Sequence, residues 1–271
     1  MAYSNFKPII WSKYIEHELK KFTVFKEDCD FKYEGEAGKG KTVKILGVSR
    51  PTIGDYTGES IGTPEKVPDS SVYLLIDNAK FFNFMVDDVD KAQAQDGLMG
   101  AIMEEATRAL AEEEDKFIGK DLAKSAGNKS ASTQVTNGTG AVALVDAAFE
   151  KLWNAGVSNK DKVTIYITPW FYNFFKDYLI TKKTDNDELI AKGIVGMYNG
   201  ARVKMSSFIH NDGTDDCMII KTGKAYAFCN GINETEAYRP EGLFSDAVKG
   251  LDTFGGKAVR PKEIYCMKAH K

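Results

Sequence analysis

A helical pattern of about 35 residues, from Asp88 to about Ala126, is the feature that most constrains the fold of this chain. Its apolar side chains recur mostly at spacings of four or seven residues, at Leu98, Ile102, Ala106, Leu110, Phe117 and Leu122. A helix of that length would extend about 50 Å, which is longer than a typical globular helix. Because Gly97, Gly100 and Gly119 weaken the pattern locally, the sequence leaves the two ends of this helix open.

The chain ahead of this helix is expected to be mainly extended. Residues 6–25 mix aromatic and charged side chains and predict an arm with at most a short amphipathic helix. Val43 and Ile45 alternate with polar neighbours, which is the period of a strand. Residues 50–70 hold three of the 7 prolines and predict a long exposed excursion. Residues 71–86 then predict one long strand that leads into the helix.

An alternation of helices and strands is expected after the helix. Residues 126–140 are rich in glycine, serine, threonine and asparagine and predict a linker. A helix over 141–156, stopped by its final glycine, and a strand over 162–169 should follow. Thr168 is predicted to cap the next helix, with Pro169 at its first position. Turn-punctuated strands should occupy most of the remaining chain.

Composition excludes several classes of protein. The net charge of −3 and a pI near 5.8 leave no basic field to hold nucleic acid tightly through its phosphates. The longest clean apolar runs, VYLLI and AVALV, are far shorter than the roughly 18 residues that span a bilayer, so no membrane partner is expected. The 4 cysteines and 3 histidines are scattered, so neither a zinc site nor any other cofactor is expected.

The sequence GEAGKGKT (35–42) matches the phosphate-binding P-loop, and Asp77 follows a later strand as a magnesium ligand would. The P-loop requires a helix directly after the loop, because the amides at the start of that helix bind the phosphate. The residues after Thr42 are β-branched, broken by glycine and followed by Pro51, so no useful helix fits there. A hairpin turn with exposed lysines is the favoured interpretation. A nucleotide-dependent enzyme that uses Lys41, Thr42 and Asp77 is the alternative.

The sequence GESIG (58–62) matches the nucleophile elbow of serine hydrolases. That motif also needs a strand, a sharp turn and a helix, whereas Ser60 lies in the glycine- and proline-rich excursion. Nothing in the sequence singles out His210 or His270 as the base that would activate Ser60. The sequence therefore does not favour an esterase.

Two further groups have a structural and a functional interpretation. Three acids follow the predicted long strand, Asp87, Asp88 and Asp90, and could bind a divalent cation. Capping of a helix N-terminus explains acids at this position more simply, so the metal site is kept as an alternative. Five aromatic side chains form one stripe at helical spacing: Trp170, Phe171, Phe174, Phe175 and Tyr178. Because no arginines are interleaved, core packing is favoured over stacking on nucleobases, and no catalytic residue or metal ligand is predicted.

The order of these elements resembles the major capsid protein of tailed bacteriophages, the Hong Kong ninety-seven-type shell fold. The most specific piece is FNFMVDDVDKAQAQ (82–95), where an aromatic strand meets paired acids and an Ala/Gln-rich helix start. The remainder of the resemblance is carried by three further segments: FKPIIWSKYIEHEL (6–19), YEGEAGKGKTVKILGV (33–48) and DYTGESI (55–61). The resemblance covers essentially the whole chain, and it rests on the joint order of these pieces.

The resemblance implies an α+β fold with four divisions. Residues 1–30 would form the N-terminal arm, and residues 31–127 the first part of a peripheral domain. That part would include an extended hairpin, the E-loop, over 41–74 and a spine helix over 91–124. Residues 128–231 would form an axial domain, and 232–271 would return to the peripheral domain as strands.

The function implied is structural, without catalysis. The chain would self-assemble through pentamers and hexamers into an icosahedral shell that encloses double-stranded DNA in a virion, and assembly would occur in the bacterial host cytoplasm. Expected contacts between subunits involve Phe6 and Trp11 on the arm and Tyr56 and Lys66 on the excursion. No partner for a cross-link through Lys66 can be identified.

Other partners also follow from the resemblance. Portal and decoration proteins are expected. Because no long charged helical segment precedes the arm, and the chain starts with Met1, the scaffolding protein is expected to be separate. A nanocompartment shell of the encapsulin type, which would enclose cargo enzyme, is the alternative within the same fold.

Overall fold

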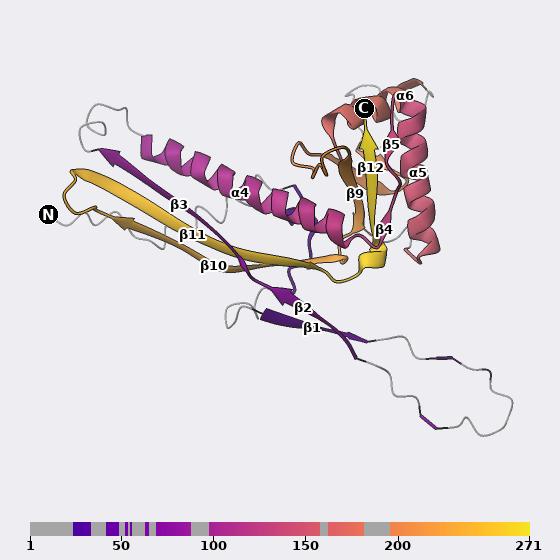
Figure 1. The fold of residues 1–271 in the computed structure, drawn as a ribbon, viewed down its shortest axis with the longest axis horizontal. Helices are drawn as coiled ribbons and strands as arrows, with labels where there is room; N and C mark the ends of the chain where they lie inside the picture. The colour runs from indigo at the N-terminus through magenta and orange to yellow at the C-terminus, as the bar shows by residue number, and fades with distance from the viewer. Residues whose placement is uncertain are drawn as a thin grey trace.

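The structure is a computed structural model of the chain, and Figure 1 shows an elongated molecule. A long helix lies along a long sheet, and a smaller body of helices and strands occupies one end. The residues that the structure describes are 24–33, 42–48, 52–53, 55, 63–64, 69–87, 98–157, 162–181 and 196–271.

The helices within these ranges are the α-helices α4 (Leu98–Ser125), α5 (Gly138–Asn154) and α6 (Pro169–Thr181) and the 3-10 helices η1 (Lys26–Asp28) and η2 (Pro261–Glu263). The strands are β1 (Thr42–Val48), β2 (Asp69–Leu75), β3 (Asn78–Asp87), β4 (Asn128–Lys129), β5 (Thr133–Gln134), β6 (Val163–Ile167), β7 (Met197–Tyr198), β8 (Ala201–Met205), β9 (Asp216–Thr222), β10 (Tyr226–Tyr238), β11 (Ser245–Ala258) and β12 (Ile264–His270).

The long helix α4 has 28 residues and extends about 42 Å, which confirms the prediction from Leu98 onward. The predicted part before Leu98 lies outside the described residues. The buried residues of α4 recur every three or four positions, at Met103, Thr107, Leu110, Glu114, Ile118 and Leu122. A glutamate therefore lies in the middle of an otherwise mainly apolar stripe, where burial of an unpaired charge would be costly.

The long sheet has the strand order β10-β11-β3, with both pairs antiparallel. Val248 on β11 packs with Met103 and Leu110 of α4, so one face of the sheet is covered by the helix. The register of β10 shifts between Asn230 and Asn233, which is a β-bulge.

The strand predicted over 71–86 is two strands, which corrects the sequence interpretation. β2 ends at Leu75 and pairs with β1, whereas β3 begins at Asn78 and pairs with β11. Between them the chain passes close over β11, because a Cβ on Gly255 would collide with the carbonyl of Leu75. The break falls at Asp77-Asn78, a polar pair typical of turns, which interrupts the apolar run in the sequence.

The smaller body contains a seven-stranded sheet along the path β4-β12-β9-β6-β8-β7, with β5 also paired to β12. Every residue of β6 is buried, and α5 and α6 pack in the same core. The predictions of α5, β6 and α6 are confirmed, and the backbone φ of +93° at Gly156 agrees with its predicted role as the helix stop.

One local prediction in this body needs correction. The predicted linker 126–140 forms the short strands β4 and β5, which pair in parallel with β12. Its asparagine Asn137 caps α5, because its side chain accepts a hydrogen bond from the Gly140 amide at 2.8 Å. Thr168 directly precedes α6, and its hydroxyl donates to the sulfur of Met218 at 3.9 Å.

Sheet membership differs from the predicted division at residue 231. β10 begins at Tyr226 and belongs to the long sheet, so the passage between the two sheets lies slightly earlier in the chain. β12, the last strand, pairs with β9 in the smaller body and does not join the long sheet. β11 alone of the last two strands follows the predicted return.

Candidate inter-subunit surfaces

The hairpin of β1 and β2 has one face buried against its own chain. Paired residues of antiparallel strands share a face, so Val43 lies beside Leu74 and both are buried. They pack with Ala227 and Cys229 at the start of β10. This contact attaches the hairpin to the body of the molecule.

The opposite face of the hairpin carries three exposed large apolar side chains, Leu46, Tyr73 and Leu75. Leu46 is 70% exposed. An antiparallel ribbon that buries one face normally presents polar side chains on the other. This surface, the hairpin outer face, is therefore an apolar surface that the described part of the chain does not cover.

A second exposed apolar surface lies on the long sheet, on the side away from α4. Phe82 and Phe84 pack toward α4, so the alternate side chains of β3, Phe81 and Met85, point the other way. Phe81 is 77% exposed and Met85 is also exposed. Leu251 lies opposite Phe81 on β11 and enlarges this apolar surface.

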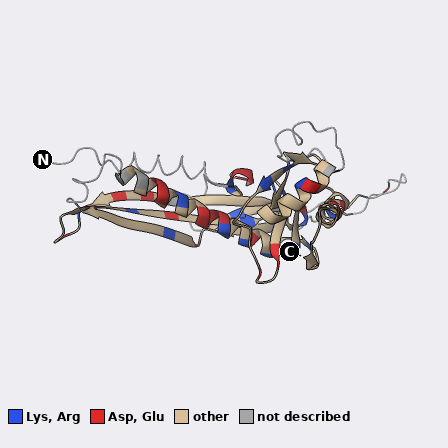
Figure 2. Ribbon diagram, turned by 90° about the horizontal axis from the view of Figure 1, so that it is seen from above, with Lys and Arg blue, Asp and Glu red and all other residues tan. Residues whose placement is uncertain are grey.

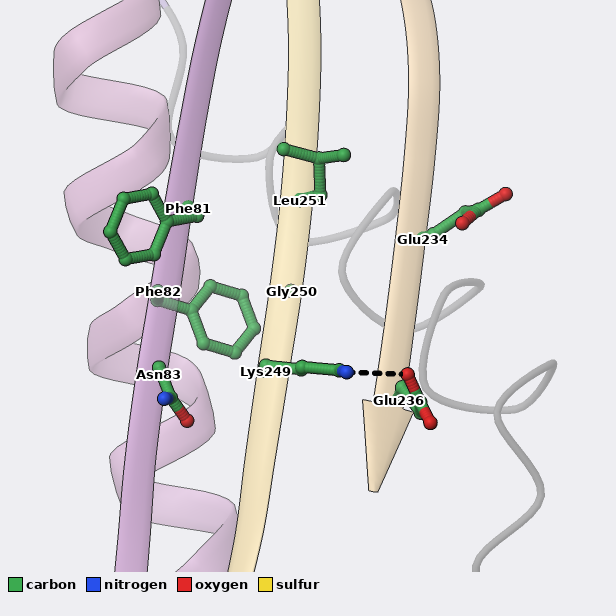
Figure 3. A pocket seen from close by; sticks show the side chains of 8 residues that line it. All are labelled: Phe81, Phe82, Asn83, Glu234, Glu236, Lys249, Gly250 and Leu251. Carbon is green, nitrogen blue, oxygen red and sulfur yellow. Dashed lines mark ion pairs between the residues drawn. The ribbon is translucent and has the colours of Figure 1, made fainter. Parts of the chain in front are cut away.

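This outer sheet face, defined by Phe81, Met85, Leu251, Glu234, Glu236 and Lys249, also carries charge. Lys249 and Glu236 form an ion pair at 2.8 Å across β11 and β10 (Figure 3). Phe81 and Leu251 help to line a shallow pocket of about 400 Å³ on this part of the sheet. An apolar row flanked by charges is typical of a protein-binding surface rather than of a catalytic site.

The root of the N-terminal arm is fixed to α4 by buried charges. Lys26 in η1 donates to both carboxylate oxygens of Glu114, at 2.9 and 3.1 Å. The neighbouring Asp115 accepts hydrogen bonds from the backbone amides of Val24 and Phe25. Burial raises the pKa of Asp115 to about 6, although these amides and Lys26 oppose the rise.

A second group of charges holds the arm root against the smaller body. Asp28 accepts a hydrogen bond from the Tyr166 hydroxyl at 2.8 Å and ion-pairs with Arg202 and Lys204. The buried ammonium of Lys221 donates to the backbone carbonyl of Asp28 at 2.6 Å. Burial by itself raises the pKa of Asp28, but the hydrogen bonds from Lys204 and Tyr166, together with nearby lysine charges, lower it overall.

The four residues predicted to contact other subunits, Phe6, Trp11, Tyr56 and Lys66, lie outside the described residues. The structure therefore leaves these predictions as predictions. The hairpin outer face and the outer sheet face are surfaces that sequence reasoning missed. A signal for the outer sheet face was present in FFNFMV (81–86), where large apolar residues occupy both faces of one strand.

The P-loop match lacks the structural context that phosphate binding needs. Residues 35–41 lie outside the described residues, but Thr42 begins the strand β1 and no helix follows it. β1 pairs antiparallel with β2, whereas a P-loop crossover would make these two strands parallel. The favoured turn with exposed lysines lies outside the described residues and stays a prediction. Asp77 lies between β2 and β3, where its carboxylate accepts a hydrogen bond from the Asn78 side chain.

The described parts of the other motifs form no catalytic arrangement. Ser60, Asp88 and Asp90 lie outside the described residues, and Asp87 is the last residue of β3. Phe171 and Phe175 are fully buried, which confirms core packing for the aromatic stripe. The other three stripe residues, Trp170, Phe174 and Tyr178, pack against the same core.

A serine, an aspartate and a histidine do meet at the edge of the seven-stranded sheet. Ser132 donates to Asp215 Oδ1 at 2.9 Å, and His270 Nδ1 lies 2.7 Å from the same oxygen. The hydroxyl is therefore directed at the carboxylate, whereas a nucleophilic serine requires a hydrogen bond to the imidazole. The described ranges contain no group of three side chains that could hold a metal ion, and no described helix is long and apolar enough to cross a membrane.

Acidic and basic side chains are interspersed along α4 (Figure 2). Glu113 pairs with Lys80 at 2.9 Å and with Lys116 at 3.0 Å, and Arg108 lies 3.4 Å from Glu112. Pairing of this kind leaves no broad field of one sign along the helix.

Solved structures share this arrangement over nearly the whole chain. A structure from Mycobacterium phage Che8 is 28% identical, covers 90% of this chain and 90% of its own, and has a TM-score of 0.79. The capsid of cyanophage P-SCSP1u is 16% identical over 92% of this chain and 88% of its own, with a TM-score of 0.76. The chain has the capsid fold of tailed bacteriophages.

The same fold occurs beyond phages. A virus-like particle from Pyrococcus furiosus is 12% identical over 96% of this chain and 98% of its own, with a TM-score of 0.62. No protein-family model and no curated protein sequence matches the chain. The resemblance read from the order of the elements is thus confirmed by structure, where sequence comparison found nothing.

Proposed function

We propose that this chain is the major capsid protein of a tailed bacteriophage, with a structural role and no catalysis. It self-assembles through pentamers and hexamers into an icosahedral shell that encloses double-stranded DNA. The observation that carries this proposal is the agreement with phage structures over about nine-tenths of the chain, at up to 28% identity. The virion capsid is its location, after assembly in the host cytoplasm.

The hairpin outer face supports assembly. A two-stranded ribbon is at best marginally stable alone, and this one exposes Leu46, Tyr73 and Leu75 in addition to its buried face. A neighbouring subunit that covers this face would stabilise the assembly by about 25 cal/mol for each Å² of apolar surface that becomes buried. The predicted contacts of Tyr56 and Lys66 belong to the same hairpin segment and to the same proposal.

The arm root supports a second contact between subunits. Val24 to Asp28 are fixed to the body by the hydrogen bonds of Asp115 and Asp28, so residues before Val24 start from a defined point. Phe6 and Trp11 lie on that preceding arm and are proposed to pack on a neighbouring subunit. A scaffolding protein, a portal and decoration proteins are the further partners proposed.

The interspersed charge supports enclosure of DNA without tight binding. The formal net charge of −3 and the pairs along α4 offer no extended basic surface for phosphates. DNA would then be confined by the shell and not held at specific sites.

Negative-stain electron microscopy of the concentrated, purified protein tests this function. We expect capsomers or closed particles of megadalton mass. The double variant Leu46→Ser/Tyr73→Ser should keep the circular dichroism spectrum of the wild type but lose the particles, whereas Glu105→Ser, on an exposed position of α4, should keep them. A wild-type protein that stays monomeric at every concentration and salt, with scaffold present, would contradict the proposal.

A nanocompartment of the encapsulin type is the second candidate. The Pyrococcus furiosus virus-like particle matches over 98% of its own chain, so the fold alone does not select a phage shell. The contents of particles from the native source distinguish the two functions. Double-stranded DNA supports the phage capsid, and a cargo enzyme without DNA supports the nanocompartment.

A further inference from the structure

We propose that Glu114 on α4 and Asp252 on β11 form a proton-dependent clamp between the long helix and the long sheet. While one proton is shared between the two carboxyl groups, the helix is held against the sheet. When that proton is lost, the contact loosens. The clamp lies within one chain, so it does not depend on the function proposed above.

The two carboxyl groups lie together in a sealed site. Glu114 is 0% exposed and Asp252 is 1% exposed. No donor from the described residues reaches either carboxylate oxygen of Asp252, and the side chain that lies against it is the carboxyl of Glu114. Two ionised carboxylates have no hydrogen to share, so this contact is a hydrogen bond only when one of them is protonated.

Among the described residues, two further charged groups face the pair, Lys26 and Asp115. Lys26 comes from η1 and binds Glu114 through both oxygens, and its ammonium also lies 5.2 Å from the ring centre of Phe228 on β10. Asp115 comes from α4 and is itself buried. One positive charge therefore faces three carboxyl groups, and full ionisation would leave two uncompensated negative charges away from water.

Such an excess is costly in a poorly solvated site, so at least one carboxyl is expected to keep its proton near neutral pH. Burial raises the pKa of Glu114 to about 7, with Lys26 opposing the rise and Asp252 adding to it. Burial also raises the pKa of Asp252, again opposed by Lys26. The direction of both pKa shifts agrees with the burial of the two carboxyl groups and with the unpaired oxygens of Asp252.

The clamp lies where the long sheet is irregular. Asp252 pairs with Asn233, the first residue of β10 after the β-bulge. A Cβ on Gly231, within that bulge, would collide with the Thr253 side chain, so the strands approach closely there. A change in the contact between Glu114 and Asp252 would therefore act next to the point where the register of β10 and β11 shifts.

The sign of the pH dependence follows from the protons bound. A carboxyl whose pKa is raised on folding binds more protons in the folded chain than in the unfolded chain. Stability is then greatest below the ordinary value of 4.5 and is lost as the pH rises toward about 7. The clamp is closed in mild acid and loosened in mild alkali.

Thermal unfolding of the full chain from pH 5 to pH 8.5, with all variants in the same assembly state, tests the clamp. The melting temperature of the wild type should fall by about 3–6 °C across this range. Asp252→Asn keeps the pair of Lys26 with Glu114 and supplies an amide that can donate to Glu114. This variant should melt higher than the wild type at pH 8, and the difference should shrink toward pH 5. Asp115 still titrates in the variant, so its melting temperature should still fall with pH, but less steeply than that of the wild type.

Glu113→Gln is the matched control, because Glu113 is exposed on α4 next to Glu114 and its pKa is lowered by Lys80 and Lys116. The melting temperature of Glu113→Gln should fall with pH as steeply as that of the wild type above pH 5. The clamp would be overturned if the melting temperature of Asp252→Asn fell with pH as steeply as that of the wild type. It would also be overturned if this variant melted lower than the wild type at pH 8. If Asp252→Asn fails to fold, hydrogen exchange of wild-type α4 amides decides the question. After correction for intrinsic rates, protection over 103–118 must fall from pH 5 to pH 8 relative to α6, and unchanged protection overturns the proposal.

Discussion

Gly250 on β11 lies directly opposite Phe82 on β3, and the Phe82 ring occupies the space that a Cβ on residue 250 would need. Phe82 also packs with Met103 and Leu110 of α4. The absence of a side chain at position 250 therefore lets one aromatic ring cover β11 and contact the long helix at once.

Gly250→Ala should lower the free energy of unfolding by about 1–3 kcal/mol, because the ring must move within a packed contact. Gly100→Ala is the matched control. Gly100 is on an exposed part of α4, and a Cβ there would meet nothing within 4 Å. That variant should instead gain about 0.5–1 kcal/mol from helix propensity. Urea unfolding measures both, and equal signs for the two variants would contradict the role of Phe82.

Tyr166→Phe should weaken the attachment of the arm root. The Tyr166 hydroxyl donates to the Asp28 carboxylate in a buried site, and a hydrogen bond to a charged group contributes about 1.5–3 kcal/mol. Tyr265→Phe is the control, because the Tyr265 hydroxyl makes no hydrogen bond to a described residue, and its effect should stay within about 0.5 kcal/mol. Hydrogen exchange should show faster exchange over residues 24–30 only in Tyr166→Phe. Equal protection of these residues in both variants would show that the hydroxyl does not hold the arm.

Acid should release the arm root. The pKa of Asp28 is lowered on folding, so its contribution to stability is present above the ordinary value of 3.8 and is lost as the pH falls below that value. Protonation also removes the charge that attracts Arg202 and Lys204. Hydrogen exchange at residues 24–30 should therefore rise relative to α5 between pH 5 and pH 2.5, after correction for intrinsic rates. Asp28→Asn should show the rapid exchange already at pH 5, and a pH-dependent profile like that of the wild type would contradict this assignment.

The regular elements could be predicted because local signals determine them. The periodicity of α4, the glycine stop of α5 and the proline at the start of α6 all lie within one turn or a few turns of the features that they explain. The break between β2 and β3 also has a local signal, the polar pair Asp77-Asn78, which the prediction of one long strand passed over. The sheet that each strand joins could not be predicted, because it depends on distant partners: Leu75 lies close to Gly255, which is 180 positions away in the chain.

The candidate surfaces and the buried charges were missed for a related reason. Lys26 and Glu114 are 88 residues apart, and nothing near either one marks it as buried. Glu114 follows Glu112 and Glu113, which are more exposed. A run of three acids in the sequence therefore predicts a solvated helix face. The composition of residues 126–140 predicts a linker because two-residue strands leave no periodic signal in the sequence.

Phe81→Ser combined with Met85→Ser should block assembly and leave the fold of the chain intact. Both side chains point away from α4 and are mostly exposed, so their loss removes little buried surface from one chain. If a neighbouring subunit covers the outer sheet face, each aromatic or large apolar anchor is worth at least about 1.4 kcal/mol, and the concentration needed for assembly rises roughly tenfold for each. Analytical ultracentrifugation across a concentration series measures this rise.

Lys80→Gln on the same strand is the control for that experiment. Lys80 is also exposed, but its ammonium pairs with Glu113 on α4, so it lies on the side of the sheet that faces the helix. Its loss should cost less than about 1 kcal/mol and should leave the assembly concentration unchanged. If Phe81→Ser/Met85→Ser assembles at the same concentration as Lys80→Gln, the outer sheet face is not covered in the shell. The hairpin outer face would then be the surface through which the described part of one chain contacts the next.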